Sequence, residues 1–256
     1  MQMLILLTND DGVEAKGLSA LRGELEKLAR TVVIAPLQEQ SASSHSLTIQ
    51  SPIEVERRGG DTWVVRGTPT DCVTLGVNKL LDERPALVVS GINHGANMGD
   101  DVSYSGTVAA ALEGMLFGIP SLAFSVAQRN PQDLVYPASF SRHICELCLE
   151  KGLPPHTVLN INFPDLPPER IRGVQVTKLG RKRMRGLNIE RIKGSNSLYW
   201  IGEEYPIWDR RDDTDIKAVG EGKISITPLH LDLTNYPAIP EIGSWGFGSK
   251  LRPWTS

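Results

Sequence analysis

Short, almost continuously apolar runs recur along the first half of the chain, separated by longer stretches in which apolar and charged residues mix. The runs at residues 4–7, 31–36, 86–91 and 121–126 are typical of strands buried on both faces of a sheet. Residues 53–67 read as a hairpin that turns at a pair of glycines.

The stretches between these runs have helical spacing. Leucines recur every three or four residues within 14–30, Pro69 suits the first turn of a helix at 69–81, and an alanine-rich helix is predicted at 105–118. Another helix is predicted around residues 140–152. Strands separated by helices of this length indicate βαβ units and a parallel sheet, and therefore the α/β class.

The pattern changes after about residue 165. Short strand-like pieces follow the proline pair at 167–168, namely residues 173–179, 197–202 and 222–229, and helical periodicity largely disappears. We interpret residues 1–165 as the core and residues 166–256 as a β-rich C-terminal extension that packs on the core and mediates oligomerisation, with one integral domain as the alternative.

Two adjacent carboxylates, Asp10 and Asp11, follow the first predicted strand. One acidic residue before Gly12 would suffice for a turn, and two held together repel unless a cation lies between them or one is protonated. Ligands of open parallel sheets bind beyond the carboxyl ends of the strands, where this pair lies.

Polar residues follow two further strands in the same direction. The segment after the second strand carries Ser41 and Ser43, and the segment after the strand at 86–91 carries Asn93. Carboxylate, hydroxyl and amide oxygens suit a hard divalent cation such as Mg²⁺ or Mn²⁺. Ordinary Asp-Gly turn chemistry accounts for the acidic pair equally well when it is considered alone.

A glycine-rich loop and a helix start strengthen the case for an anion site. Glycines at 91, 95 and 99 allow backbone N–H groups to approach a ligand, and Ser105, Gly106 and Thr107 open the alanine-rich helix, whose N-terminus suits phosphate. Ser105 could also be only an N-cap, which is compatible with phosphate binding. A cation beside such a helix favours attack on phosphorus, because it neutralises charge on phosphoryl oxygens and activates water.

Other signals narrow the function classes. GxGxxG after the first strand, a P-loop and a GxSxG elbow are all absent, which disfavours dinucleotide binding, P-loop chemistry and an α/β-hydrolase. The net charge of −3 disfavours nucleic acid as a partner of the whole molecule. With no signal peptide and no apolar run near the ~20 residues that span a bilayer, we expect a soluble, cytoplasmic protein.

The histidines and cysteines of the sequence say less about the function. His45 lies on the predicted loop after the second strand, and His94 lies on the glycine-rich loop. Each is either a proton donor or an ordinary surface histidine. Cys145 and Cys148 form a single CxxC without a second pair, which favours buried helical thiols over zinc or redox chemistry.

With these residues established, the chain resembles the SurE (stationary-phase survival protein) family of metal-dependent nucleoside-monophosphate phosphatases. The resemblance covers most of the chain and several separate motifs in one order, namely ILLTNDDGVEAKG, VVIAP, SASSHSLT, GTPTDCV, VVSGINHGANMGDDVSYSGTVAAALEG and, more weakly, DTDIKAVGEGKISITPL.

The resemblance implies a Rossmann-like parallel-sheet core with helices on both faces, and one divalent cation per subunit, Mg²⁺ or Mn²⁺. The implied metal ligands are Asp10, Asp11, Ser41 and Asn93. We further predict that Asp10 and Asp11 are catalytic and that Asp10 is the carboxylate that handles the proton. The implied phosphate and substrate contacts are Asn9, Asn97, Ser105, Gly106 and Thr107.

The family also implies 5'-nucleotidase activity, in many members with 3'-nucleotidase and in some with exopolyphosphatase activity. Association as a homodimer or homotetramer through the C-terminal β arm is implied as well. Leu37, Gln40 and Ala96 depart from the family pattern, which often has Asp, Arg and Pro there, and the consequence for affinity and substrate preference is open.

Two other functions remain as alternatives. A nonenzymatic nucleotide or RNA binder would use a basic run at 178–193, whose members are Lys178, Arg181, Lys182, Arg183, Arg185, Arg191 and Lys193. The same cluster of oxygen ligands would also serve a metal-dependent hydrolase of another ester or amide. The sequence does not reveal the preferred base.

Overall fold

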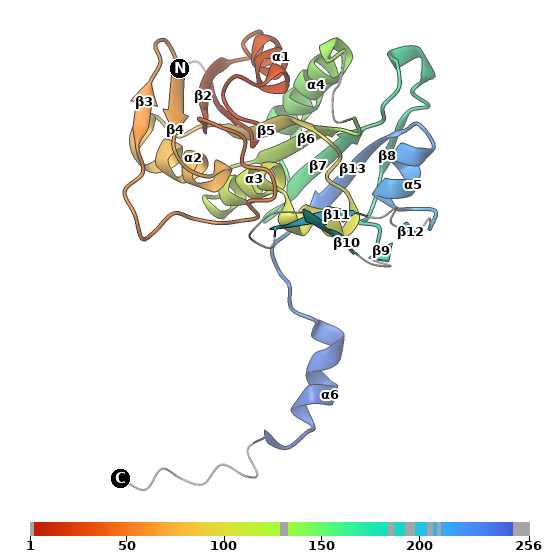
Figure 1. Cartoon of the computed structure of the whole chain (residues 1–256). Coiled ribbons are helices and arrows are strands. Elements are labelled where there is room, and N and C mark those ends of the chain that lie inside the picture. The colour runs from red at the N-terminus through yellow and green to blue at the C-terminus, as the bar shows by residue number, and fades with distance from the viewer. Residues whose placement is uncertain are drawn as a thin grey trace, which may run out of the picture.

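The structure is a computed structural model that describes residues 3–128, 133–183, 187–192, 198–203, 207–208 and 211–247, with the backbone alone for those within 182–208. At its centre lies a nine-stranded sheet in the order β3-β4-β2-β1-β5-β6-β7-β13-β8 (Figure 1). Its strands are β1 (Leu4–Thr8), β2 (Arg30–Pro36), β3 (Val55–Arg57), β4 (Thr62–Val65), β5 (Leu87–His94), β6 (Ser121–Val126), β7 (Val158–Phe163), β8 (Val174–Val176) and β13 (Ile224–Leu229).

Six neighbouring strands, from β4 to β7, are parallel, and β3 and β13 pair antiparallel with β4 and β7. The α/β class and the parallel core are therefore confirmed. Leu4 to Leu7 are almost fully buried, as the continuous apolar run predicts, because helices cover both faces of this strand. β7, which the sequence analysis did not predict, alternates apolar residues with buried asparagines.

The helices form two layers. α1 (Lys16–Leu25) and α4 (Val135–Lys151) pack together on one face of the sheet, and α2 (Pro69–Leu75), extended by a π-helical turn at Gly76–Leu80, and α3 (Gly106–Leu116) pack on the other (Figure 1). The buried leucines of α1 meet the buried cysteines Cys145 and Cys148 of α4 in one apolar cluster, so the predicted helical thiols are confirmed.

The connections from β1 and β5 leave the sheet in opposite directions. β1 leads to α1 on one face, and its neighbour β5 leads to α3 on the other. Two adjacent parallel strands whose connections diverge leave a crevice beyond their carboxyl ends. The residues that follow β1 and β5 therefore lie at the topological switch point of the sheet.

The connection from β6 to β7 departs from the usual hand. β5 and β6 are joined through α3, whereas β6 and β7, the next step in the same direction, are joined through α4 on the opposite face. These two crossovers therefore differ in hand, although parallel crossovers are almost always right-handed.

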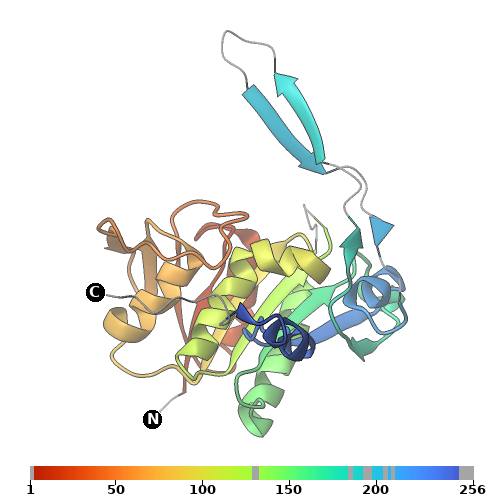
Figure 2. The same cartoon turned by 90° about the horizontal axis from the view of Figure 1, so that it is seen from below.

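Part of the chain after residue 165 belongs to the main sheet, since β13 pairs with β7 and β8 pairs with β13. The remainder includes a hairpin of β10 (Leu187–Ile192) and β11 (Leu198–Glu203), which projects from the body (Figure 2), and the short pair of β9 (Lys182–Arg183) and β12 (Ile207–Trp208). The predicted boundary at residue 165 stays a prediction.

Two short helices, α5 (Asp215–Gly220) and α6 (Ile239–Gly243), also occur after residue 165. Both are too short to show a helical period in the sequence, which explains why helical structure was not expected there. α6 stands apart from the sheet (Figure 1). No helix in the described part of the chain is long and apolar enough to cross a membrane.

Candidate functional site at the carboxyl edge of the sheet

The acidic pair lies in a tight turn after β1. The side-chain amide of Asn9 donates a hydrogen bond to the Gly12 carbonyl oxygen (2.9 Å), and the Val13 N–H bonds to the Pro36 carbonyl oxygen at the end of β2 (2.8 Å). Asn9 is fully buried. These bonds close the turn and fix it against the neighbouring strand.

Asp10 faces the N-terminus of α3. Its carboxylate accepts a hydrogen bond from the Thr107 hydroxyl, and the Thr107 N–H also faces it. A Cβ at Gly106 would lie 3.0 Å from the Asp10 Cβ and 2.7 Å from Ser43 Oγ, so the residue at position 106 has no room for a side chain. The N-terminus of α3, the Asp10 side chain and Ser43 on the loop after β2 therefore meet at one point.

Asp11 faces the end of β5. Its Oδ2 accepts a hydrogen bond from the backbone N–H of His94 (3.2 Å). Glu39, on the loop after β2, lies close enough to act on Asp11 by charge repulsion. Sequence analysis missed Glu39 because its position before Ser41 carries no motif of its own.

Both acids hold their protons unusually tightly. Burial raises the pKa of Asp10 to about 6, the bond from Thr107 opposes the rise, and the charge of Asp11 adds to it. Burial also raises the pKa of Asp11 to about 6, with the His94 N–H opposing and Glu39 adding. Burial lowers the pKa of His94, whose ring lies near Asp10. Two crowded acids therefore share a site, and no cationic side chain in the described part of the chain pairs with either of them.

This crowding predicts how the metal-free protein responds to pH. Because the folded state binds these protons more tightly than the unfolded state, the stabilisation is complete below about pH 4 and is lost as pH rises through about 6. For Asp10 alone the loss is about 3 kcal/mol. In EDTA, the Asp10→Asn/Asp11→Asn double variant should gain stability relative to the unmodified protein between pH 5 and 7.5. Urea unfolding of both proteins at pH 5 and at pH 7.5 measures the difference between their free energies of unfolding. A difference that stays the same at the two pH values would contradict the raised pKa values.

The loop after β2 is anchored on both sides. The Gln40 N–H donates to the Asp10 carbonyl oxygen (2.7 Å), which places the loop over the acidic turn. Ser41, next along the chain, is exposed and donates to Glu39 Oε1 (2.5 Å). Further on, the Thr48 N–H and hydroxyl both bond to the buried Asp71 carboxylate (2.8 and 2.7 Å).

His45 does not face the acidic pair. Its Nε2 lies 2.9 Å from Oε2 of Glu113, which is 6% exposed on α3 and also accepts a bond from the Thr74 hydroxyl (2.7 Å). This arrangement ties the loop to α3 and α2. Of the two candidate histidines, only His94 lies beside the acids.

The glycine-rich loop after β5 is held by asparagines. The Asn97 N–H donates to Asn162 Oδ1 (2.8 Å), its carbonyl oxygen accepts from Asn160 and Asn162 (2.8 and 3.0 Å), and its side-chain amide donates to Ser125 (2.8 Å). The Asn93 amide donates to the Gly95 carbonyl oxygen (2.7 Å). Asn160 and Asn162 were missed because β7 was not predicted, although polar residues alternating with apolar ones were the available signal.

A buried acid after residue 165 supports the same loop. Asp215 is fully buried, and its carboxylate accepts hydrogen bonds from the N–H groups of Gly99 and Gly180 (2.8 Å each). The glycine-rich loop is therefore tied to the segment that leads into the C-terminal strands.

The structure brings together some predicted site residues more closely than others. Asp10, Gly106 and Thr107 are in contact, and Ser105 caps α3 by accepting a bond from the Val108 N–H (3.1 Å). Ser41 and Asn93 lie next to residues that bond to the acidic turn, but their own side chains bond elsewhere. Asn97 anchors its loop.

The donor set suits a cation. Asn9 Oδ1 and Ser43 Oγ are buried oxygens without a hydrogen-bond partner among the described residues, close to the two acids. No group of three or more His, Cys, Asp or Glu side chains in the described part of the chain is placed to hold a metal. An ion bound to Asp10 and Asp11 would therefore take its other ligands from hydroxyl, amide or backbone oxygens, which suits Mg²⁺ or Mn²⁺.

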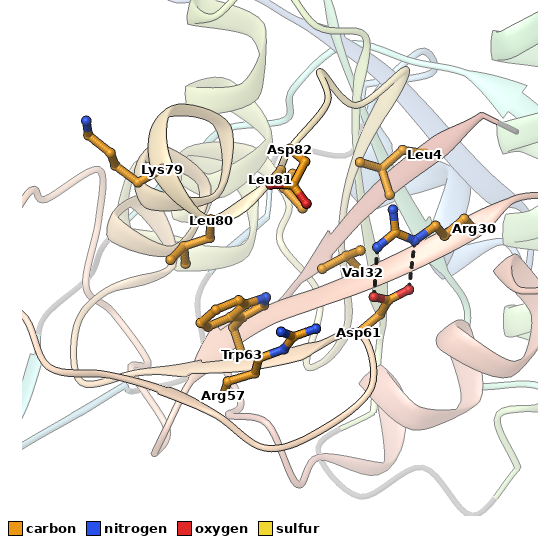
Figure 3. Close-up of a pocket in the computed structure, with 10 residues that line it drawn as sticks. All are labelled: Leu4, Arg30, Val32, Arg57, Asp61, Trp63, Lys79, Leu80, Leu81 and Asp82. Carbon is orange, nitrogen blue, oxygen red and sulfur yellow. Dashed lines mark hydrogen bonds and ion pairs between the residues drawn. The ribbon is translucent and has the colours of Figure 1, made fainter. Parts of the chain in front are cut away.

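A cavity of about 290 Å³ lies away from the acidic pair, at the edge of the sheet where the amino ends of its parallel strands lie (Figure 3). It is lined at the amino ends of β1, β2 and β4, where Arg30 makes two hydrogen bonds with Asp61 (2.9 Å each) and Arg57 stacks on Trp63. None of the predicted site residues reaches this cavity.

Of the basic run, Lys178 pairs with Asp213 (2.6 Å). The side chains of Lys182, Arg183, Arg185, Arg191 and Lys193 lie outside the described residues.

With this geometry established, comparison with known proteins decides the family. A family profile described as Survival protein SurE matches residues 5–186. The chain belongs to the SurE family. The 5'-nucleotidase SurE of Geotalea daltonii is 48% identical over 246 residues, which make up 95% of this chain and 99% of that protein. The 5'-nucleotidase SurE of Citrifermentans bemidjiense is 46% identical over the same shares.

A solved structure agrees. The crystal structure of the SurE protein from Aquifex aeolicus matches with a TM-score of 0.84 at 41% identity, covering 94% of this chain and 98% of that one. The predicted family resemblance is confirmed, and with it the α/β fold. Since these SurE relatives match almost end to end, the C-terminal strands belong to the shared architecture.

Proposed function

We propose that the chain is a metal-dependent 5'-nucleotidase that hydrolyses nucleoside monophosphates to nucleosides and inorganic phosphate. The observation that carries the proposal is the buried Asp10 carboxylate against the N-terminus of α3, with Asp11 beside it, in a chain 46–48% identical to proteins named 5'-nucleotidase SurE. The SurE family is a family of metal-dependent nucleotidases.

One divalent cation, Mg²⁺ or Mn²⁺, is proposed per subunit, with Asp10, Asp11, Ser41 and Asn93 as its protein ligands. When bound, it supplies positive charge that neutralises the phosphoryl oxygens and lowers the pKa of water. The raised pKa values of the two acids and the unpartnered oxygens of Asn9 and Ser43 support this assignment.

The protein's own residues orient and move the proton. The Thr107 hydroxyl holds Asp10 Oδ1, and Oδ2 lies toward Gly106, so we assign to Oδ2 the proton of the attacking water. The N-terminus of α3 offers backbone N–H groups and partial positive charge to the phosphate. Asn9 and Asn97 are proposed to shape the phosphate cradle, since Asn9 closes the acidic turn and Asn97 anchors the glycine-rich loop.

Phosphate release from a panel of substrates tests this function. With Mn²⁺ or Mg²⁺ we expect hydrolysis of AMP, GMP and CMP, weaker hydrolysis of 3'-nucleotides and polyphosphate, and none of p-nitrophenyl acetate. EDTA should abolish turnover and added metal should restore it. Undiminished turnover in EDTA, or carboxylic ester cleavage without phosphate release, would exclude the proposal.

The C-terminal segment is proposed to mediate a homodimer or homotetramer. The β10–β11 hairpin projects from the body (Figure 2), and α6 stands apart with apolar side chains exposed, among them Ile239 (52% exposed) and Ile242 (42%). Exposed apolar surface of this kind marks an interaction site. A monomer in sedimentation equilibrium would contradict this assembly.

A further inference from the structure

A cavity of about 320 Å³ lies beside the acidic turn, above the carboxyl ends of β2 and β4. Its walls come from two chain segments, the loop after β2, including its start and Thr48, and the connection from β4 to α2. Its lining includes Leu37, Gln38, Gln40, Thr48, Arg66 and Thr68. Binding sites for small molecules have volumes of about 300–1,000 Å³, so this cavity is large enough for one compact ligand group.

The cavity and the acidic turn share a wall. The Gln40 N–H donates to the Asp10 carbonyl oxygen (2.7 Å), and a Cβ on Gly12 would lie 3.2 Å from the carbonyl carbon of Gln38. The strand order β4-β2-β1 puts the cavity next to the switch point. A ligand bound at Asp10 can therefore extend across this wall into the cavity.

Most polar groups that line the cavity already have partners. Thr48 bonds to Asp71, the Thr68 hydroxyl bonds to the Ser46 carbonyl oxygen (2.7 Å), and Arg66 pairs with Glu54 (2.9 Å). In contrast, the side-chain amides of Gln38 and Gln40 make no hydrogen bond to any residue that the structure describes. A carboxamide both donates and accepts and carries no charge, which suits the edge of a nucleobase better than a phosphate.

We propose that this cavity receives the base of the nucleoside monophosphate, with the amides of Gln38 and Gln40 on the edge of the base and Leu37 against its ring. This assignment rests on the proposed function, because it requires the phosphate to lie against Asp10 and the N-terminus of α3. It makes Gln38 and Gln40 specificity-determining residues.

The cavity at the amino edge of the sheet does not compete for this role (Figure 3). Two of its cationic side chains are engaged, since Arg30 is paired with Asp61 and Arg57 stacks on Trp63. It also opens at the edge opposite to Asp10, so one nucleotide cannot reach both.

Substrates with and without a base test the assignment. In Gln38→Ala/Gln40→Ala, kcat/KM for AMP should fall about 10- to 25-fold, since a neutral hydrogen bond is worth about fivefold. The value for ribose 5-phosphate, which has the same ester without the base, should change less than twofold. Leu37→Trp, which fills the cavity, should raise KM for AMP about tenfold. Gln50→Ala, an exposed glutamine on the same loop outside the cavity, is the matched control.

Equilibrium binding of adenosine gives a second readout that does not need turnover. Calorimetry should show adenosine binding to the unmodified protein and at least tenfold weaker binding to the double variant. Equal losses for AMP and ribose 5-phosphate, or unchanged adenosine binding, would overturn the base subsite. If the unmodified protein hydrolyses neither ester, the nucleotidase proposal fails, and adenosine binding still decides the cavity.

Discussion

Replacing Asp10 with asparagine should lower phosphate release from AMP by about 10³-fold, within the range of about 10²–10⁴ that a positioned proton acceptor contributes. Asparagine retains an oxygen that can accept the Thr107 hydroxyl, so the contact with α3 persists. What is lost is the negative charge beside Asp11 and the ability to take a proton. Steady-state kinetics at saturating Mn²⁺ measures the effect.

Two comparisons make this result specific. Asp165→Asn changes an exposed aspartate that makes no hydrogen bond to a described residue, and it should leave kcat and KM unchanged. The unfolding midpoint of Asp10→Asn in EDTA at pH 7.5 should not fall, because the variant removes a buried charge. A near-normal kcat for Asp10→Asn would show that Asp10 does not accept the proton in the reaction.

The second large effect concerns stability. A Cβ on Gly17, within α1, would lie 1.9 Å from the carbonyl oxygen of Ile92 on β5, so Gly17→Ala forces α1 away from the sheet. Because the contact is with backbone that cannot rotate aside, we expect a loss of about 3 kcal/mol in the free energy of unfolding. Urea unfolding measures this loss.

The same helix supplies the control. A Cβ on Gly23 meets nothing within 4 Å, so Gly23→Ala should raise the free energy of unfolding by about 0.5–1 kcal/mol through the lower entropy of the unfolded chain. Equal effects of the two substitutions would show that α1 can move at no cost. The carbonyl that Gly17 approaches is one residue from Asn93, so this packing also sets the position of the glycine-rich loop.

The acidic turn and the helix N-terminus were predictable because each depends on local chemistry. Adjacent acids after a buried strand are unstable without a compensating partner, and Ser105 before an alanine-rich helix is a strong N-cap signal. The contact between Asp10 and Thr107 was not predictable, since 97 residues separate them along the chain. Their meeting depends on β1 and β5 lying side by side.

The residues that hold the glycine-rich loop in place could not be predicted from the sequence either. Asn160 and Asn162 lie on β7 and Asp215 lies on α5, and as isolated polar residues they resemble loop or cap positions. Only their burial against Asn97 and Gly99 shows that they hold the glycine-rich loop. The hand of the β6–α4–β7 crossover likewise has no signal in the sequence. The spacing of apolar residues shows that one side of a helix is buried, but it does not show on which face of the sheet the helix packs.

The sequence by itself determined most strands of the central sheet, though not β7, together with the acidic turn, the alanine-rich helix and the family, because apolar period, turn chemistry and motif order are local properties. The tertiary structure alone decided which distant groups meet. It buried Asp10 and Asp11 enough to raise their pKa values, set Thr107 against Asp10, and opened a cavity beside Gln40. Burial and proximity depend on how the layers pack, and that packing is a property of the whole fold.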